Sequence, residues 1–136
     1  MSFIALTATA TPEVVEDIEE QLSFKESNKI KKSFKRNNIH YSVINTIDKE
    51  KVLVKLLSNE CSIIYVRNRK KTKELSKLLN SKNYKTDYYH AGLDFRERSE
   101  KQTKWINNEF DTMIATNAFG MGIDKPDVKT VIHFDL

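Results

Sequence analysis

A short apolar run near the end of the chain leads directly into a loop that carries two of the chain's three glycines. The run is Thr112–Ala115, and Gly120, Gly122 and Asp124 follow it. Glycine permits a positive φ and lets a ligand approach the backbone closely. In open α/β sheets, ligands bind in loops at the carboxyl ends of the strands. The segment therefore predicts a buried strand that ends at a ligand-binding loop, with a tight strand connection as the structural alternative.

Helical patterns alternate with apolar runs along the chain. The predicted N-caps are Thr11, which precedes Pro12, and Asp48 and Asn68. A fourth helix is expected over residues 95–107, with Trp105 and Ile106 facing inward. The predicted strands are Phe3–Leu6, Tyr41–Ile44, Cys61–Val66, Thr86–Tyr89, Thr112–Ala115 and Val128–Phe134. This alternation indicates an α/β fold of three layers, α/β/α, with a mainly parallel sheet of about five strands.

Charge and composition narrow the class of protein. The net charge is +4, but residues 1–22 hold five acids and no lysine or arginine, so the remainder is strongly basic. A basic body favours a polyanionic partner, because neutralising phosphates releases counterions; a solvated lysine-rich surface is the alternative. No apolar run approaches the roughly 20 residues that span a bilayer. The single Cys61 excludes an internal disulfide and a multi-cysteine zinc site. We therefore expect no membrane partner, no metal site and an intracellular, cytoplasmic location.

Four short segments, taken together, are distinctive of one protein family. They are ALTATA (Ala5–Ala10), SIIYVRNR (Ser62–Arg69), YHAGL (Tyr89–Leu93) with Arg98, and TNAFGMGID (Thr116–Asp124) followed by VIHFD (Val131–Asp135). In this order and spacing they resemble motif III, motif IV, the loop before the next helix, and motif V of the RecQ-type DNA helicases of superfamily 2. One departure is Asn68, where this family more often has serine or threonine.

The resemblance implies a RecA-like fold and a role for each matched residue. The nucleic-acid contacts would be Arg69, His90, Gly92, Thr116 and Asn117. Gly122 and Asp124 would face the nucleotide sugar. Thr7, Ala8 and Thr9 would couple the nucleotide state to the strand-binding surface. Structural readings stand beside these roles: Arg69 as a solvated helix-start residue, His90 as the donor to a loop carbonyl, Arg98 as an intradomain hydrogen-bonding residue and Trp105 as core.

Groups that this class of enzyme needs for ATP hydrolysis are absent from the sequence. A P-loop of the pattern G-x-x-x-x-G-K-[ST] cradles the phosphates in such enzymes, and an acidic residue holds Mg²⁺. The three glycines, at positions 92, 120 and 122, do not form that pattern. The family's arginine finger belongs to motif VI, which would follow the last strand. We therefore expect no complete catalytic set in this chain, with ATP and Mg²⁺ bound by the full-length enzyme and neither bound by this chain alone.

The resemblance also predicts a domain organisation. Residues 1–24 would be the end of the first RecA-like domain, 25–38 a connector, and 39–136 the second RecA-like domain, cut before motif VI. The expected partners are single-stranded or partly duplex DNA and the missing first RecA-like domain. Without that domain, the strand at residues 3–6 would be disordered or would associate with an exposed edge or a neighbouring molecule.

The expected function is therefore that of one part of an ATP-dependent 3′→5′ DNA helicase. Two alternatives stay open at this point. The chain can be the second domain of a DEAD-box-like RNA helicase, since Thr116–Asp124 aligns with both groups. It can also be a non-catalytic nucleic-acid-binding module.

Overall fold

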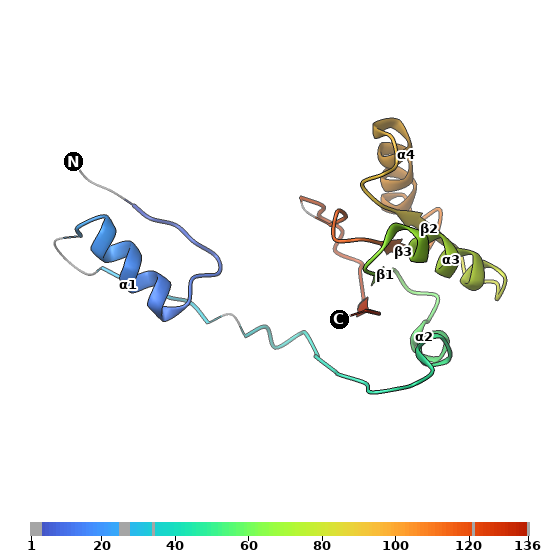
Figure 1. Ribbon diagram of the computed structural model, residues 1–136, viewed down its shortest axis with the longest axis horizontal. Coiled ribbons are helices and arrows are strands. Elements are labelled where there is room, and N and C mark those ends of the chain that lie inside the picture. Colours follow the sequence, from blue (N-terminus) through green and yellow to red (C-terminus); the bar gives the residue numbers. More distant parts are fainter. Residues whose placement is uncertain (1–3, 25–27, 34, 121, 136) are drawn as a thin grey trace. The chain divides into compact units, whose positions relative to one another are not determined.

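The computed structural model describes residues 4–24, 28–33, 35–120 and 122–135. The chain divides into two compact units, residues 1–43 and 44–136, which are described separately. The first unit contains helix α1 (Pro12–Gln21) (Figure 1). The predicted start of α1 is confirmed: the Thr11 side chain accepts a hydrogen bond from the Val14 amide, and Pro12 is the first helical residue.

The predicted strand at residues 3–6 is wrong for the described residues of that segment. Ile4 and Leu6 are 86% and 92% exposed and belong to no strand, and Phe3 lies outside the described residues. Tyr41–Ile44 is not a strand either, and Tyr41 is 86% exposed. Residues with high β propensity form a strand only where a neighbouring strand pairs with them and a core covers one face. In the part of the chain that the structure describes, neither segment pairs with another strand.

The described residues of the second unit form a parallel sheet and three helices. In chain order the elements are α2 (Lys49–Leu56), β1 (Ser62–Tyr65), α3 (Arg69–Asn80), β2 (Thr86–Tyr89), α4 (Phe95–Ile106), β3 (Thr112–Ala115) and β4 (Thr130–His133). The strand order is β2-β3-β1-β4, and every pair is parallel. The described sheet therefore has four strands rather than the predicted five, because Tyr41–Ile44 does not join it.

Side-chain caps set where the helices of the second unit begin. Asp48 accepts a hydrogen bond from the Lys51 amide at 3.1 Å, and Asn68 accepts one from the Lys71 amide at 2.8 Å. Each bond satisfies a backbone donor that has no partner inside its helix. The N-caps that the sequence predicted are thus confirmed.

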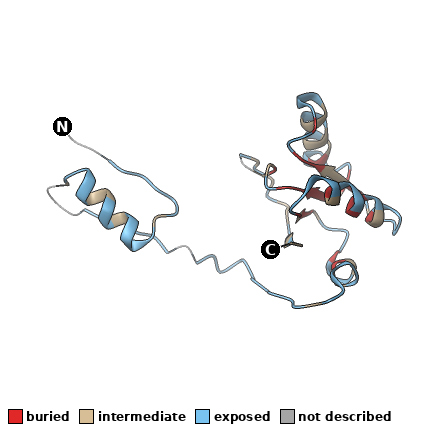
Figure 2. Cartoon of the chain, in the orientation of Figure 1, coloured by how far each residue is buried: buried red, intermediate tan, exposed pale blue. Residues whose placement is uncertain are grey.

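The core has two halves, one on each face of the sheet (Figure 2). Helices α2 and α3 cover one face, where Leu53, Leu75 and Ile64 pack together. Helix α4 covers the other face, where Trp105 packs with Met113 and other residues. Trp105 is 1% exposed, which confirms the expectation that it is core, whereas Ile106 is 44% exposed and does not face inward. The predicted three-layer α/β/α arrangement is therefore confirmed.

Candidate functional site

Loops that follow the strands gather at one edge of the sheet. Because all four strands are parallel, their carboxyl ends meet there. The loop after β1 leads to Arg69, the loop after β2 contains His90 and Gly92, and the loop after β3 contains Thr116, Asn117, Gly122 and Asp124. We call this set of loops the strand-end rim. The structure thus places five of the predicted site residues directly after strand ends at one edge: Arg69, His90, Gly92, Thr116 and Asn117. From there the loop after β3 passes through Gly122 and Asp124 to Lys125, whose Nζ contacts Asn108, a residue that precedes β3.

Arg69 and Gly92 contact each other across the rim. Arg69 is the first residue of α3, and Gly92 lies in the loop between β2 and α4. A Cβ atom on Gly92 would stand 2.7 Å from Nη1 of Arg69 and 3.1 Å from its Cζ. A side chain at this position would therefore displace the arginine side chain, which passes directly over Gly92. The contact keeps the guanidinium at the rim, although the residue itself is exposed.

The ring of His90 is buried, and its nitrogens lack hydrogen-bond partners in the described part of the chain. The residue is 5% exposed, and neither Nδ1 nor Nε2 has a partner among the described residues. The reading of His90 as a donor to a loop carbonyl is therefore wrong. Its ring stacks on Tyr88, with centroids 5.8 Å apart. Burial lowers the pKa of His90, and the nearby cations Lys73 and Arg69 lower it further. The imidazole thus remains neutral near pH 7, with a donor and an acceptor to offer.

Arg98 was expected to form hydrogen bonds within the domain, and one of its side-chain nitrogens does not do so among the described residues. Its Nε atom is buried and has no partner among the described residues. Its backbone amide donates to Asp94, as expected near the start of α4. The side chain lies on the helix that follows the His90 loop, so the rim region contains polar atoms from two residues that the fold leaves unpaired.

The loop after β3 has the backbone geometry that its glycines predicted. Gly120 and Gly122 adopt φ of +106° and +75°, a region that favours glycine. A Cβ on Gly122 would meet nothing within 4 Å, so the space beside it is open. Thr116 is buried, and its amide donates to the Tyr89 carbonyl at 3.2 Å. Asp124 is exposed, so its carboxylate is available to a ligand.

Two residues that anchor this loop were not predicted from the sequence. The Tyr65 hydroxyl donates to the Phe119 carbonyl at 3.1 Å. The side chain of Lys125 is only 4% exposed, and its Nζ contacts Oδ2 of Asp127 at 2.8 Å and Oδ1 of Asn108 at 2.6 Å. No pattern in the sequence distinguishes these two side chains from ordinary strand and surface residues, because their partners lie in other elements.

The predicted coupling residues Thr7, Ala8 and Thr9 belong to the first unit. They are exposed, and the Thr9 amide donates to Oγ1 of Thr7 at 3.4 Å. Within the described ranges, no group of three or more His, Cys, Asp or Glu side chains is arranged to hold a metal ion. Every helix in those ranges is too short or too polar to cross a membrane.

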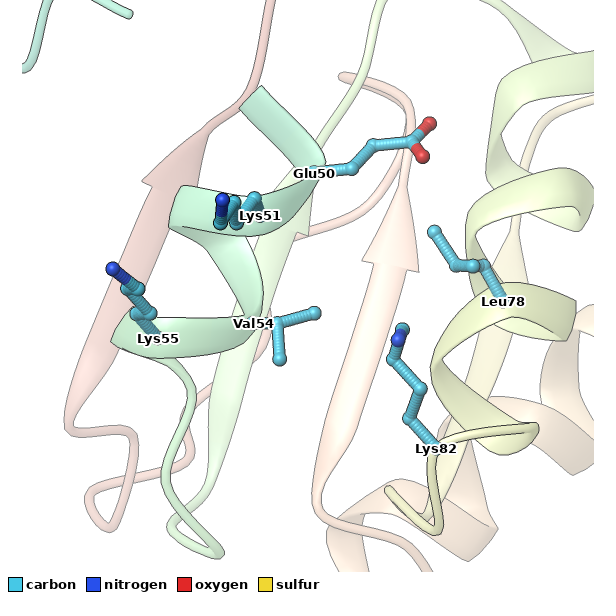
Figure 3. A pocket seen from close by; sticks show the side chains of 6 residues that line it. All are labelled: Glu50, Lys51, Val54, Lys55, Leu78 and Lys82. Carbon is cyan, nitrogen blue, oxygen red and sulfur yellow. The ribbon is translucent and has the colours of Figure 1, made fainter. Parts of the chain in front are cut away.

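A groove between α2 and α3 is separate from the rim (Figure 3). Its lining residues are Glu50, Lys51, Val54, Lys55, Leu78 and Lys82. None of them is a predicted site residue. The groove therefore supplies lysines that serve as controls for charge in the experiments below.

A parallel α/β domain with basic and glycine-rich loops at one edge is a ligand-binding domain of the open-sheet type. Residues 48–136 match the helicase conserved C-terminal domain. The chain belongs to this family and is part of a helicase domain.

Comparison with individual proteins identifies RecQ-type relatives. The chain is 41% identical, over 98% of its length, to RecQ-like DNA helicase blm-1 of Caenorhabditis elegans. It is 37% identical, over 96% of its length, to ATP-dependent DNA helicase RecQ of Bacillus subtilis. It spans 14% and 22% of the lengths of these two relatives. The RecQ-type resemblance that the motifs predicted is confirmed.

Solved structures of DEAD-box proteins share the fold. Dbp5 of Saccharomyces cerevisiae, bound to RNA and ADP BeF3, matches with a TM-score of 0.74 at 24% identity, over 96% of this chain and 35% of that chain. The Escherichia coli DEAD-box protein SrmB, bound to regulator of ribonuclease activity A, matches with a TM-score of 0.59 at 30% identity, over 65% of this chain and 54% of that chain. The predicted RecA-like fold is thereby confirmed.

Proposed function

We propose that this chain forms one wall of the ATP cleft, and part of the single-stranded DNA surface, of a RecQ-type 3′→5′ DNA helicase. The observation that carries the proposal is the strand-end rim, where the loops after three parallel strands begin at one edge of the sheet. The RecQ-type relatives, which match over nearly the whole chain, support DNA as the nucleic acid.

On the DNA side, the rim offers cationic and polar groups. Arg69, held over Gly92, would pair with a backbone phosphate. Both ring nitrogens of His90 are buried in the free chain, so His90 would contact a nucleotide after the surrounding loop opens. Thr116 and Asn117 would offer a hydroxyl and an amide to the next phosphate. An arginine beside polar loop groups is the combination that tracks a nucleic-acid backbone.

On the nucleotide side, the fit with ATP is partial. Open space beside Gly122 would admit a ligand against the backbone, and the exposed Asp124 carboxylate would accept hydrogen bonds from a ribose. ATP, when bound, supplies the free energy of phosphoryl transfer. This chain offers no P-loop for the phosphates and no acidic ligand set for Mg²⁺, so a first RecA-like domain would supply both.

The same proposal assigns the remaining parts of the chain. Residues 1–24 would complete the first RecA-like domain, with Thr7, Ala8 and Thr9 as the coupling segment. Residues 25–38 would connect the domains, and residues 39–136 would be the second RecA-like domain. The whole would act inside the cell on single-stranded or partly duplex DNA.

A titration of fluorescent oligo(dT) with this chain, at several salt concentrations, tests the DNA surface. We expect affinity that falls steeply with salt, and an Arg69→Ala variant that lowers the slope of log K against log salt by about 1. Lys55→Ala removes the same charge in the α2–α3 groove and should leave the slope closer to that of the wild type. An equal decrease of the slope in both variants would mean that the DNA is bound by the overall positive charge of the surface and not by the rim.

Two further measurements separate the alternatives. Oligo(rU) should bind more weakly than oligo(dT); a clear preference for RNA would favour the DEAD-box-like reading. ATP turnover by the purified chain, with oligo(dT) present, should equal the blank. Turnover clearly above the blank would defeat the proposal that the phosphate-binding groups lie elsewhere.

A further inference from the structure

Tyr65 joins the loop after β3 to the end of β4. It is the last residue of β1, which lies between β3 and β4 in the sheet. Its hydroxyl donates to the Phe119 carbonyl at 3.1 Å. Its ring stacks on His133, the last residue of β4, with centroids 5.3 Å apart and planes 20° apart. One side chain therefore contacts elements on both sides of its own strand.

Gly120 lies against the same hydroxyl, with no room for a Cβ atom. A Cβ atom at this position would stand 2.6 Å from the Tyr65 oxygen, closer than van der Waals contact allows, and 3.9 Å from Cζ. The positive φ of Gly120, +106°, also disfavours a side chain. Burial raises the pKa of Tyr65, so the phenol stays protonated and remains a donor. The close approach needs both partners, a tyrosine at 65 and a glycine at 120.

The bonded carbonyl lies midway along the functional loop. Thr116 and Asn117, on the DNA side of the proposed function, precede Phe119 in the loop. Gly122 and Asp124, on the nucleotide side, follow it. Further along, Lys125 fixes the end of the loop through Asn108 and Asp127. The bond from Tyr65 thus holds the loop between its two proposed ligand contacts.

We propose that Tyr65 is a positioning residue for this loop, and that its hydroxyl sets the spacing between the DNA-contacting and nucleotide-contacting halves. The two ligands of the loop, DNA and nucleotide, rest on the proposed function. The hydrogen bond from Tyr65 to the Phe119 carbonyl, which we call the latch, is a property of the chain itself. Without the hydroxyl, the loop backbone would open more often while the sheet stayed intact.

Amide hydrogen exchange of the chain tests the latch directly. Tyr65→Phe keeps the stacked ring and removes the bond to Phe119. We expect exchange of the Phe119 and Ile123 amides, which donate to Thr116 and Gly120 within the loop, to rise about three- to tenfold, the factor of one net hydrogen bond. Tyr84→Phe is a matched control, because the Tyr84 hydroxyl donates to the Val54 carbonyl at the same 3.1 Å. That variant should leave loop exchange unchanged.

A double-mutant cycle tests the close approach at Gly120. Gly120→Ala alone suffers both the unfavourable φ and the clash with the hydroxyl. Tyr65→Phe removes the hydroxyl and therefore the clash. Gly120→Ala should then raise the amide exchange rate of the loop by a factor at least three times smaller than it does when Tyr65 is present. Additive effects would contradict the proposed contact. Loop exchange in Tyr65→Phe equal to that in the wild type would overturn the latch.

The positioning role has its own readout. In a chain that binds oligo(dT), Tyr65→Phe should weaken binding at least threefold, whereas Tyr84→Phe should not. A loop that exchanges faster without any loss of affinity would refute the positioning role. Absence of DNA binding by the wild-type chain would refute the proposed function instead, and the exchange results would then decide on the latch alone.

Discussion

Replacing His90 by phenylalanine should stabilise the protein. The residue is 5% exposed, and both ring nitrogens lack a partner among the described residues. A buried polar group without a partner costs about 1–3 kcal/mol. Phenylalanine removes both polar atoms and keeps a ring to stack on Tyr88. Part of the gain is lost because the new ring is larger than imidazole. We expect a net gain of about 1–2 kcal/mol in the free energy of unfolding.

The gain should grow as the pH falls. Burial, with Lys73 and Arg69 nearby, lowers the pKa of His90 in the folded state below its unfolded value of about 6.5. As the pH drops through that unfolded value, the unfolded chain binds a proton that the folded chain does not. Stability from this group is therefore present above about pH 6.5 and is lost toward the lowered folded pKa. His90→Phe removes this loss.

Urea unfolding followed by circular dichroism, repeated between about pH 5 and pH 8, measures both effects. His133→Phe is the control, because His133 is exposed and its replacement should change stability by less than about 0.5 kcal/mol. The reasoning is refuted if His90→Phe is less stable than the wild type at pH 7, or if its advantage does not depend on pH. The variant should also bind oligo(dT) more weakly, since the unpaired nitrogens are proposed DNA contacts.

Substitutions at three further positions have expected outcomes. Gly92→Ala should displace the end of the Arg69 side chain and lower oligo(dT) affinity as much as Arg69→Ala does. Its free energy of unfolding in urea should change by less than about 1 kcal/mol. Unchanged oligo(dT) affinity would show that the contact between Gly92 and Arg69 is not needed. Trp105→Ala should cost about 3–5 kcal/mol of unfolding free energy, because the indole is buried against Phe119; a loss below 1 kcal/mol would contradict its place in the core. Gly122→Ala should cost about 1 kcal/mol through the positive φ alone, and Gly122→Asn less; equal or reversed costs would point to a steric cause.

Local sequence signals predicted the elements of the second unit well. The bounds of β2 and β3 are those expected from the sequence. Asp48 and Asn68 cap the helices that they were expected to cap. Caps and short apolar runs act through neighbours in the chain, so one sequence contains the relevant information. Tyr41–Ile44 failed for the opposite reason: a strand needs a pairing partner, and its own residues do not say whether one is present.

In the site, too, local features were predictable from the sequence and long-range contacts were not. The parallel sheet, once predicted, places the start of every loop that follows a strand at one edge, and the glycines predicted the positive φ angles in the loop after β3. Long-range contacts were not predictable, because nothing near Tyr65 in the sequence indicates a bond to Phe119. The unpaired state of His90 was also missed, since the sequence shows the residue type but not the space around it. Roles within the rim remain predictions from the family resemblance.

The most direct test of the account is a map of amide chemical shifts in the labelled chain during titration with oligo(dT). We expect the shifts to concentrate in the strand-end rim, at residues 66–69, 90–93 and 116–124. Residues of the α2–α3 groove, such as Lys55 and Lys82, should not change. Shifts confined to that groove, or spread evenly over the lysine-rich surface, would contradict the claim that the rim is the nucleic-acid surface.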